Sequence, residues 1–503
     1  MAINPVISWI VNKRIYQIGL FKEYPVEVQN ELLMRMIRGA QYTEWGKMHD
    51  FKSIDAPEEF RNRFPVQTYE DLLPFIERMK AGKQNILWHN EIKWFAKSSG
   101  TTSERSKFIP VSLEALEDCH YKGGKDLVSL YFNNYPDSEV LRGKTLVIAG
   151  SKTSINNEDD NYIGDLSAIM TDNLPFWVEM RRTPSMHITL MDDWEEKIDK
   201  IANQTIHEDV RVISGVPSWT LVILKRILEI TGKKNIREVW PKIELFMHGG
   251  VNFTPYKKQF EKLIPGTMNY LESYNASEGY FGIEDQLNSE DLLLMLDYGI
   301  YYEFIPMDRF EKNDMNTISL SEVELDVNYA LVITTTSGLW RYLIGDTIKF
   351  TSIHPFRIKV TGRTKHFINA FGEEVIIDNA EKALQKACSE TNAIINEFTA
   401  GPVYMDDNDT GAHEWLIEFE KDPDNLDRFV LELDNELKKI NSDYDAKRTN
   451  DFTLKLPIVH SLPIGVFYRW LKSKDKLGGQ FKIPRLANSR WFIEELKKMQ
   501  VAK

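Results

Sequence analysis

A serine- and threonine-rich segment, SSGTTSERSK, is the first part of the chain whose residue types could do chemistry. Six of its ten residues, from Ser98 to Lys107, carry hydroxyl groups, one is glycine and two are cations. Gly100 can adopt a left-handed backbone conformation that lets successive amides converge on one point. Hydroxyls, amides and the charges of Arg105 and Lys107 together suit a polyphosphate that is held and then released as pyrophosphate. A solvated surface loop explains the same residues equally well.

A second segment, SYNASEGYFG, places Tyr274, Ser277 and Glu278 directly after an expected strand. An aromatic ring at such a position can cover a nucleobase, while a hydroxyl and a carboxylate can reach a phosphate and its Mg²⁺ ion. A core tyrosine beside a surface glutamate would leave the same pattern. The segment is therefore informative only in combination with others.

Three further residues could complete a nucleotide site. Asp346 follows a glycine in GLWRYLIGDTIKF, and its carboxylate can accept the two hydrogen bonds that a ribose diol donates. Arg363, in TGRTKH, is a cation that could contact the ribose or a phosphate. Lys482 follows a pair of glycines in KDKLGGQFKIPRL. Taken singly, a turn aspartate and a solvated lysine are the ordinary explanations.

The elements that must position these residues include short apolar runs with the character of strands. Residues 144–151, 243–250 and 268–279 are such runs, and residues capable of chemistry stand at their C-terminal ends. Ligands bind at that edge of open α/β sheets. The flanking segments IKWFAK and KFIPVS are also strand-like, so we expect the hydroxyl-rich segment to be a tight connection between two strands.

The remainder of the chain predicts two domains. Residues 1–90 are mostly helical and amphipathic, and from residue 292 the sequence becomes rich in strands. After residue 362 a smaller α+β pattern begins, with a helix around 378–391. We therefore expect an α/β fold, with a large N-terminal α/β domain (1–362) that includes a β-rich part and a small, mobile α+β C-terminal domain (363–503). One helical stripe in the N-terminal region consists of Val28, Leu32, Leu33 and Met36.

Composition excludes several classes of protein. The 503 residues are 42% hydrophobic and 27% charged, which is ordinary for a globular chain of more than one domain. The net charge of −13 disfavours non-specific binding to nucleic acid or to an anionic membrane surface. Two distant cysteines, no secretory signal and no apolar run approaching 18 residues favour a cytoplasmic protein without a membrane span.

The common nucleotide and metal motifs are absent from the sequence. It contains no G-x-x-x-x-G-K-[ST] loop, no G-x-G-x-x-G after a strand, no H-E-x-x-H and no paired C-x-x-C. The ten histidines do not cluster at metal-ligand spacing. These absences disfavour a Rossmann dehydrogenase, a P-loop NTPase and a zinc enzyme.

Taken together and in this order, the segments resemble the adenylate-forming superfamily of acyl-CoA ligases, luciferases and peptide-synthetase adenylation domains. More narrowly, the chain is similar to the Gretchen Hagen auxin-responsive family of acyl acid amido synthetases, in its bacterial-type form. The resemblance covers nearly the full chain and includes TEWGK, FPVQTYEDLLPFIERMKAGKQNIL, GVPSW, YYEFIP and GGQFKIPRL. It implies that a carboxylic acid attacks Mg·ATP to form an acyl-adenylate and pyrophosphate, and that an amino acid amine then displaces AMP.

The resemblance also implies roles for individual residues. Glu278, beside Ser277, would meet the α-phosphate and the Mg²⁺ ion, and Lys482 would reach into the site during adenylation, which makes Glu278 and Lys482 the catalytic pair. Tyr274 would stack on adenine, while Asp346 and Arg363 would bind the ribose. The loop that grips the ATP phosphates would consist of Ser98, Ser99, Gly100, Thr101 and Thr102, with Lys107 at its end.

Two positions depart from the family pattern. Ser103 stands where many relatives have glycine, so the phosphate loop is expected to be less pliant. Lys365 stands where the superfamily often has a hinge aspartate. The resemblance therefore does not support a detailed hinge mechanism.

The resemblance also implies that the acyl acid binds near two apolar segments, which would suit an aromatic or medium-length acid. Plain hydrophobic core is the competing explanation for these side chains, and the sequence indicates no position for the acceptor amino acid or for the oligomeric state. Two other functions remain open, namely an acyl-CoA ligase with a thiol acceptor and a catalytically idle nucleotide-binding protein. The expected pocket residues are Met170, Leu174, Trp177, Val216 and Trp219.

Overall fold

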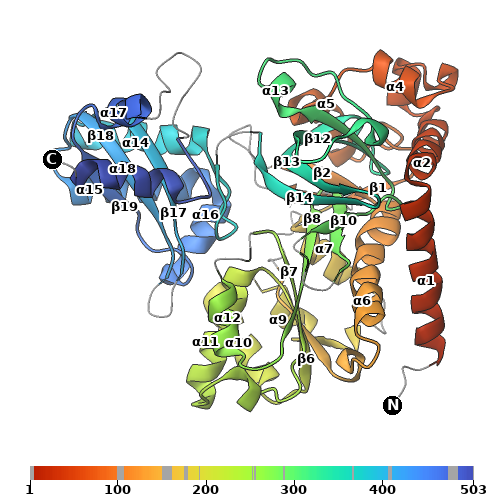
Figure 1. Ribbon diagram of the computed structural model, residues 1–503, viewed down its shortest axis with the longest axis horizontal. Helices are drawn as coiled ribbons and strands as arrows, with labels where there is room; N and C mark the ends of the chain where they lie inside the picture. The colour runs from red at the N-terminus through yellow and green to blue at the C-terminus, as the bar shows by residue number, and fades with distance from the viewer. Residues whose placement is uncertain are drawn as a thin grey trace.

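The computed structural model describes most of the chain and places the C-terminal part beside a larger body (Figure 1). No helix among the described residues is long and apolar enough to cross a membrane. The described residues are 5–98, 107–149, 161–174, 179–191, 193–251, 253, 256–286, 289, 291–364, 367–405, 410–473 and 485–501.

The N-terminal region is helical, as the apolar periodicity predicts. Of the four stripe residues, Leu32, Leu33 and Met36 are buried and Val28 is half-buried. The fifth helix begins at a capping box, in which the Thr68 hydroxyl accepts a hydrogen bond from the Asp71 amide and the Asp71 carboxylate accepts one from the Thr68 amide. The elements are α1 (Pro5–Glu23), α2 (Pro25–Ala40), α3 (Glu44–Met48), η1 (Phe51–Ser53), α4 (Pro57–Arg63) and α5 (Tyr69–Lys80).

One sheet of eleven strands forms the centre of the large body. The strands from β5 to β8 run parallel, and those from β8 to β11 alternate in direction. The order is β11 (Ile300–Pro306), β12 (Asn328–Thr335), β13 (Tyr342–Ile353), β14 (Phe356–Arg363), β10 (Leu292–Leu294), β9 (Gly279–Glu284), β8 (Asn269–Ala276), β7 (Leu245–Gly249), β6 (Val210–Ser214), β3 (Lys144–Val147) and β5 (Arg182–Thr183).

The predicted strands are confirmed within this sheet. The three apolar runs of the sequence form β3, β7 and β8 of the parallel half, and the β-rich region after residue 292 forms the antiparallel half. Side chains alternate between the two faces, so Val212 and Leu245 enter one hydrophobic core while Ile213 and Phe246 enter the other. Because β6, β7 and β8 run parallel, their carboxyl ends share one edge of the sheet.

Helices cover both faces of the parallel half (Figure 1). α1 and α6 lie on one face, and α10, α11 and α12 lie on the other. The remaining elements of the large body are η2 (Ala115–Tyr121, a π-helical turn), α6 (Lys122–Asn134), η3 (Val140–Arg142), α7 (Leu166–Asp172), α9 (Met186–Thr189), α10 (Trp194–Thr205), α11 (Pro217–Thr231), η4 (Ile236–Glu238), α12 (Lys257–Leu263), α13 (Met307–Phe310) and η5 (Leu320–Glu322).

A small three-stranded sheet carries the two ends of the hydroxyl-rich segment. Its order is β2 (Lys107–Ser112), β1 (Ile92–Ser98) and β4 (Tyr162–Gly164), with β1 and β2 antiparallel. Ser98 pairs with Lys107 in the register of the hairpin. The two flanking strands of the prediction are thus confirmed, while residues 99–106 lie outside the described part of the chain.

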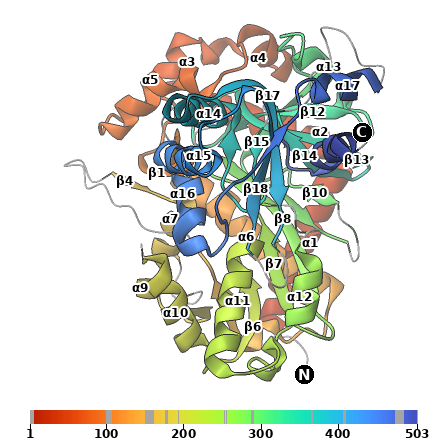
Figure 2. The same ribbon diagram turned by 90° about the vertical axis from the view of Figure 1, so that its left-hand side faces the viewer.

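The C-terminal part is an α+β unit with its own three-stranded sheet, as the sequence pattern predicts. Its helices and sheet lie in front of the large sheet when the molecule is turned (Figure 2). The elements are β15 (Phe367–Ile368), β16 (Val375–Ile376), α14 (Ile377–Thr391), β17 (Ile394–Val403), β18 (Ala412–Lys421), α15 (Leu426–Ile440), α16 (Ser442–Arg448), η6 (Thr449–Asp451), β19 (Ile458–Leu462), α17 (Val466–Ser473) and α18 (Trp491–Val501).

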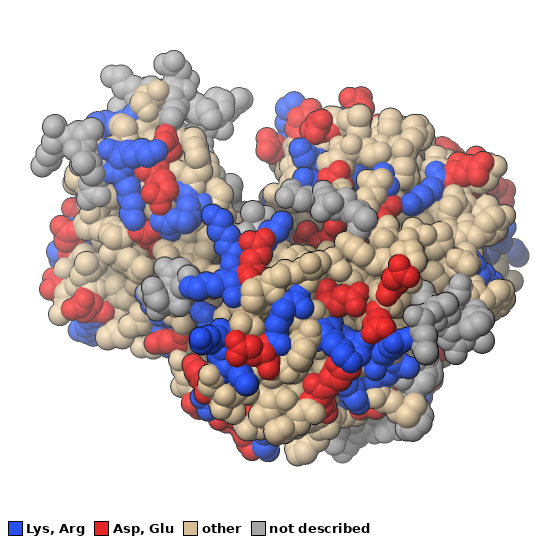
Figure 3. All heavy atoms as spheres, turned by 60° about the horizontal axis from the view of Figure 1, so that its bottom comes forward, with Lys and Arg blue, Asp and Glu red and all other residues tan. Residues whose placement is uncertain are grey.

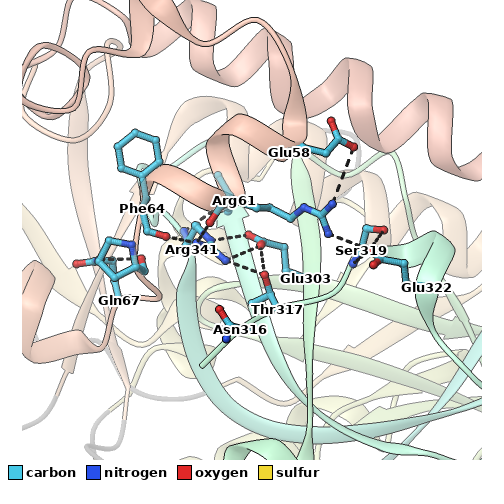
Figure 4. A network of polar contacts seen from close by, with 12 residues as sticks. Glu58, Arg61, Phe64, Gln67, Glu303, Asn316, Thr317, Ser319, Glu322 and Arg341 are labelled. Carbon is cyan, nitrogen blue, oxygen red and sulfur yellow. Dashed lines mark hydrogen bonds and ion pairs between the residues drawn. The ribbon is translucent and has the colours of Figure 1, made fainter. Parts of the chain in front are cut away.

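A buried polar network fixes the start of β13, the strand that carries Asp346 (Figure 4). The Arg341 guanidinium donates to both carboxylate oxygens of Glu303, at 3.1 and 2.9 Å, and to the Thr317 hydroxyl at 2.7 Å. It also donates to the backbone carbonyls of Arg61 and Phe64 in and after α4. One arginine therefore ties the N-terminal helices to the middle of the sheet.

We expect Arg341→Met to lower the free energy of unfolding by about 3–5 kcal/mol, because Glu303 would be left fully buried without a counter-charge. The variant Arg341→Met/Glu303→Leu should lose less, since both charges are then removed. Urea denaturation followed by tryptophan fluorescence measures both. A loss below about 1 kcal/mol for Arg341→Met alone would show that the network contributes little.

Candidate active site

Three of the predicted nucleotide-binding residues meet where β8, β13 and β14 lie near one another. The Tyr274 hydroxyl donates to one oxygen of Asp346 at 2.5 Å, and Nε of Arg363 donates to the other oxygen at 2.9 Å. Asp346 and Arg363 are direct partners in the register of β13 and β14. Burial, and next the negative charge of Asp346, raise the pKa of Tyr274 well above its ordinary value, so its hydroxyl stays protonated and donates.

Arg363 also contacts the C-terminal part of the chain. Its two terminal nitrogens donate to the carboxylate oxygens of Glu374 at 3.3 and 3.1 Å, and its guanidinium lies 5.2 Å from the centre of the Phe367 ring. Burial lowers the pKa of Arg363, but the carboxylates of Glu374 and Asp346 outweigh it and the pKa is raised. Arg363 is therefore a fixed positive charge between the two parts.

Glu374 is a site residue that the sequence did not predict. Its backbone is left-handed, with φ of 39°, and its amide donates to the Asn369 side chain at 3.4 Å. The neighbouring Glu373 is fully buried and accepts hydrogen bonds from the amides of Ala370 and Phe371. The only signal in the sequence was a pair of glutamates ten and eleven residues after Arg363, which by itself indicates nothing specific.

Lys107 is a buried cation at the end of the hydroxyl-rich segment. Its side chain nitrogen donates to the Tyr342 hydroxyl at 3.2 Å and lies 5.6 Å from the centre of the Tyr69 ring. No carboxylate of the described residues forms an ion pair with it. Burial lowers the pKa of Lys107, and the negative charge of Glu278 opposes that shift. The ammonium group thus keeps free donors for an anionic ligand.

Tyr69 and Tyr342 were also missed as site residues. Tyr69 additionally accepts a hydrogen bond from the Phe108 amide at 2.8 Å, which fixes the first turn of α5 against the start of β2. Tyr342 lies in the segment WRYLIGD, four residues before Asp346. The segment itself was singled out, but the contact with Lys107 joins residues 235 positions apart in the chain. Sequence spacing cannot reveal such a contact.

Ser277 and Glu278 form the two-residue turn between β8 and β9. Glu278 is half-buried, and its carboxylate has no ion-pair partner in the described part of the chain. Burial raises its pKa to about 7; the positive charge of Lys107 opposes this shift, and the negative charge of Asp346 adds to it. An anionic Glu278 is therefore costly unless a cation binds beside it.

The donor set around Glu278 fits a magnesium ion. Mg²⁺ is usually held by one or two carboxylates, with substrate phosphates and water as its other ligands. A single free carboxylate near a buried cation matches that arrangement. The described residues contain no group of three or more His, Cys, Asp or Glu side chains that could hold a metal without such a substrate.

The expected acyl-pocket residues within the described part of the chain lie in two separate segments. α7 ends at Asp172, so Leu174 lies beyond the helix, and Met170 packs against the first hydrophobic core. Trp219 is only 3% exposed and belongs to the second core, with the half-buried Val216 packed against that core. Met170, on the one hand, and Val216 and Trp219, on the other, thus lie against two different hydrophobic cores. The assignment of these residues to the acyl acid stays a prediction.

Several of the predicted site residues lie outside the described part of the chain. Ser98 ends β1 within the described part, at the edge of the site. The residues not described are those expected in the phosphate loop after Ser98, one residue expected in the acyl pocket, the position expected at the hinge and the lysine expected to act in adenylation. These residues are Ser99, Gly100, Thr101, Thr102, Trp177, Lys365 and Lys482.

Comparison with known proteins finds relatives along almost the whole chain. The chain is 23% identical to the 4-substituted benzoates-glutamate ligase GH3.12 of Arabidopsis thaliana, with 95% of each chain covered. It is 22% identical to the indole-3-acetic acid-amido synthetase GH3.3 of the same plant, covering 93% of this chain and 90% of the relative. The jasmonoyl-L-amino acid synthetase JAR4 of Nicotiana attenuata is 22% identical over 65% of this chain and 67% of its own length.

Solved structures share the fold. The GH3.15 acyl acid amido synthetase superposes with a TM-score of 0.60 at 17% identity, covering 95% of this chain and 93% of its own. A 2-hydroxyisobutyryl-CoA ligase superposes with a TM-score of 0.53 at 13% identity, covering 95% and 92%. The α/β fold with a separate C-terminal unit is thus confirmed.

Models of one family match three successive parts of the chain. The GH3 family N-terminal domain matches residues 14–268, the central domain matches residues 293–363 and the C-terminal domain matches residues 378–491. The first of these alone covers half of the chain. The chain therefore belongs to the GH3 family.

Proposed function

We propose that this protein is an ATP-dependent acyl acid amido synthetase, a ligase that forms AMP. It would adenylate a carboxylic acid with release of pyrophosphate and then transfer the acyl group to an amino acid amine with release of AMP. The observation that carries the proposal is the convergence of Tyr274, Asp346 and Arg363 beside Lys107 and Glu278. Related proteins are named for the same reaction with benzoates, indole-3-acetic acid and jasmonate.

The nucleoside would bind at Asp346. Each carboxylate oxygen already accepts one hydrogen bond, from Tyr274 or from Arg363, and each keeps a second lone pair for a ribose hydroxyl. The Tyr274 ring, held by its hydroxyl on Asp346, would stack on adenine. Because Arg363 is fixed by both Asp346 and Glu374, its charge would stay in place while the substrate binds.

The phosphates would lie between Lys107 and the β8–β9 turn. The free donors of Lys107 and the hydroxyl-rich loop from Ser98 would hold the β- and γ-phosphates, with Ser277 at the α-phosphate. Glu278 would hold the Mg²⁺ ion, which neutralises phosphate charge when bound. Lys482 would add the positive charge that the α-phosphate needs as the carboxylic acid attacks it.

The chain would divide into two domains near residues 362–365. Support comes from β14, the last strand of the large sheet in chain order, which ends at Arg363, and from the separate sheet of β17, β18 and β19. By family resemblance the C-terminal domain would rotate between adenylation and transfer. Figure 3 shows a hollow between the two parts, with basic and acidic side chains interspersed around it.

The test is acid-dependent exchange of labelled pyrophosphate into ATP, measured with a panel of aromatic and aliphatic carboxylic acids. Pooled amino acids or coenzyme A are then added, and products are identified by mass spectrometry. Exchange followed by an amide product supports the proposal and names both substrates. A coenzyme A thioester would instead make the protein an acyl-CoA ligase, and ATP binding without exchange for any acid would favour an idle nucleotide-binding protein.

We expect adenylation to lose rate as the pH falls below about 7, because metal binding needs the anionic form of Glu278 and burial holds its pKa near that value. The rate of exchange should drop about tenfold per pH unit on the acidic side. Glu278→Gln should be slow at every pH and lack this dependence. A wild-type profile that stays flat from about pH 5.5 to 8 would remove Glu278 from this role.

Glu278 should also affect the stability of the protein, and this effect should change with pH in the opposite direction to the rate of adenylation. The folded-state pKa of Glu278 is raised above its ordinary value, so the folded protein keeps a proton that the unfolded chain loses. Its contribution to stability therefore falls as the pH rises from about 4.5 to about 7. In the absence of nucleotide, Glu278→Gln should be more stable than the wild type at pH 8 and should lose that advantage near pH 4.5.

A further inference from the structure

Lys447 is a cation at the contact between the C-terminal part and the large body. It belongs to α16, on the side of the C-terminal part that faces the large body (Figure 1). Its side-chain nitrogen lies 4.9 Å from the centre of the ring of Trp219, a residue in the first turn of α11. That turn follows β6, so Lys447 lies near the edge of the sheet where the carboxyl ends of the parallel strands meet.

The turn before β16, residues 369–374, holds the end of the Lys447 side chain in place. The Ser218 hydroxyl of α11 donates to the Phe371 carbonyl in this turn at 3.2 Å, which fixes the turn against the large body. A β carbon at Gly372 would lie 3.3 Å from Cε and 3.4 Å from Nζ of Lys447. The ammonium group therefore lies between the glycine of the turn and the indole ring of α11.

The positive charge of Lys447 has no ion-pair partner in the described part of the chain. Burial lowers its pKa, and the negative charges of Asp443 and Glu373 oppose that shift. Weaker contributions of the same sign come from Asp165, at the start of α7, and from Glu374. Glu373 and Glu374 already have hydrogen-bonding partners of their own. The ammonium group is therefore available to an anionic group that binds at this contact.

We propose that Lys447 binds the α-carboxylate of the acceptor amino acid, an assignment that rests on the proposed amido synthetase activity. The other anionic groups of that reaction do not need this lysine. The phosphates of ATP have Lys107 and the hydroxyl-rich loop, and the acyl acid loses its negative charge when the adenylate forms. The acceptor keeps its carboxylate through the whole reaction, and a carboxylate that is taken out of water requires a charged partner.

The distances allow Lys447 to hold the acceptor while its amine attacks. An ion pair between Nζ and the carboxylate, with attack by the amine of the same molecule, requires the acyl carbonyl within about 9 Å of Nζ. Trp219, which is expected beside the acyl acid, lies well inside that distance. Asp165, whose charge acts on Lys447, directly precedes α7, the helix of the expected pocket residue Met170. Both segments expected at the acyl acid thus come near Lys447.

Lys447 acts in the transfer step by position and charge alone. The amine nitrogen attacks the acyl carbon, the bond from that carbon to the phosphate oxygen breaks, AMP leaves with the electron pair and the amine proton passes to solvent. Lys447 forms no covalent bond and exchanges no proton. By neutralising the carboxylate it lowers the pKa of the amine in the same molecule, so the neutral, nucleophilic form of the amine is favoured.

Amide formation from a synthetic acyl-adenylate tests this proposal, with each common amino acid and with its uncharged α-amide as acceptors. The adenylate is made from an acid that supports pyrophosphate exchange. Lys447→Gln should lower kcat/KM for the amino acid by about 10- to 100-fold, because a hydrogen bond to a charged group is lost. It should leave kcat/KM for the α-amide and the rate of exchange unchanged. Lys439→Gln, the matched control at a 73% exposed lysine of α15, should equal the wild type in every assay.

Several outcomes would overturn the proposal. An unchanged kcat/KM for the amino acid in Lys447→Gln is one, and equal losses with the amino acid and its α-amide would make Lys447 a structural residue. A wild type that uses α-amides as well as amino acids overturns it without any variant. These results, obtained with normal pyrophosphate exchange, overturn the role of Lys447 alone, whereas a wild type without exchange for any acid overturns the proposed function itself.

Discussion

Lys107→Met should reduce the rate of adenylation by about 100- to 1,000-fold while leaving the protein at least as stable as the wild type. The two effects have one cause. Lys107 is 5% exposed, and no described carboxylate forms an ion pair with it, so its charge is costly in the free protein and available to phosphate. Methionine fills a similar volume without the charge, so folding no longer includes the cost of burying an ammonium group.

Thermal unfolding measures the stability of Lys107→Met, and acid-dependent pyrophosphate exchange measures its rate of adenylation. Lys80→Met is the matched control. Lys80 is a nearby cation whose side-chain nitrogen lies 3.9 Å from the centre of the Phe108 ring, and Phe108 is the residue after Lys107 in β2. The ion-pair partner of Lys80, Glu77, is about half exposed, so the loss of this pair should cost about 1 kcal/mol or less and leave the exchange rate unchanged. If Lys107→Met unfolds at a clearly lower temperature, Lys107 is a structural residue.

Lys482→Ala should abolish most of the adenylation activity of a folded protein. A single donor aimed at the charge that develops in a transition state is worth about 3–4 kcal/mol, or roughly 100- to 1,000-fold in rate. The assignment rests on the position of Lys482 in GGQFKIPRL, within the part of the chain that matches the GH3 family C-terminal domain. The predicted loss is confined to the first step, since the lysine would act on the α-phosphate.

Supplying the acyl-adenylate directly separates the two steps. With a synthetic acyl-adenylate and an amino acid, Lys482→Ala should form amide at close to the wild-type rate. Lys498→Ala, in the exposed part of α18, should match the wild type in both assays. A Lys482→Ala variant that keeps more than about a tenth of the exchange rate would take this lysine out of the reaction.

The local sequence pattern was sufficient to predict the main helices and strands of this fold. The spacing of Leu32, Leu33 and Met36 determines a helix because those positions meet on one face. The apolar runs at β3, β7 and β8 predict strands because they are short and end in polar residues or glycine. The family motifs, found in the expected order along the chain, identified the segments of the site. This was possible because the site residues of each motif lie within a few positions of one another in the sequence.

Contacts between distant segments were decided only by the tertiary structure. Tyr69 and Tyr342 come from a helix and a strand far apart in the chain, and the fold brings both to Lys107. Glu374 has a left-handed backbone conformation, and its side chain contacts Arg363. That contact depends on how the C-terminal part packs. Residue types and local spacing thus determined what chemistry the chain can offer. The neighbours of each site residue are set by the fold. The pKa of about 7 for Glu278 is an example, because it depends on burial and on charges that only the folded chain brings together.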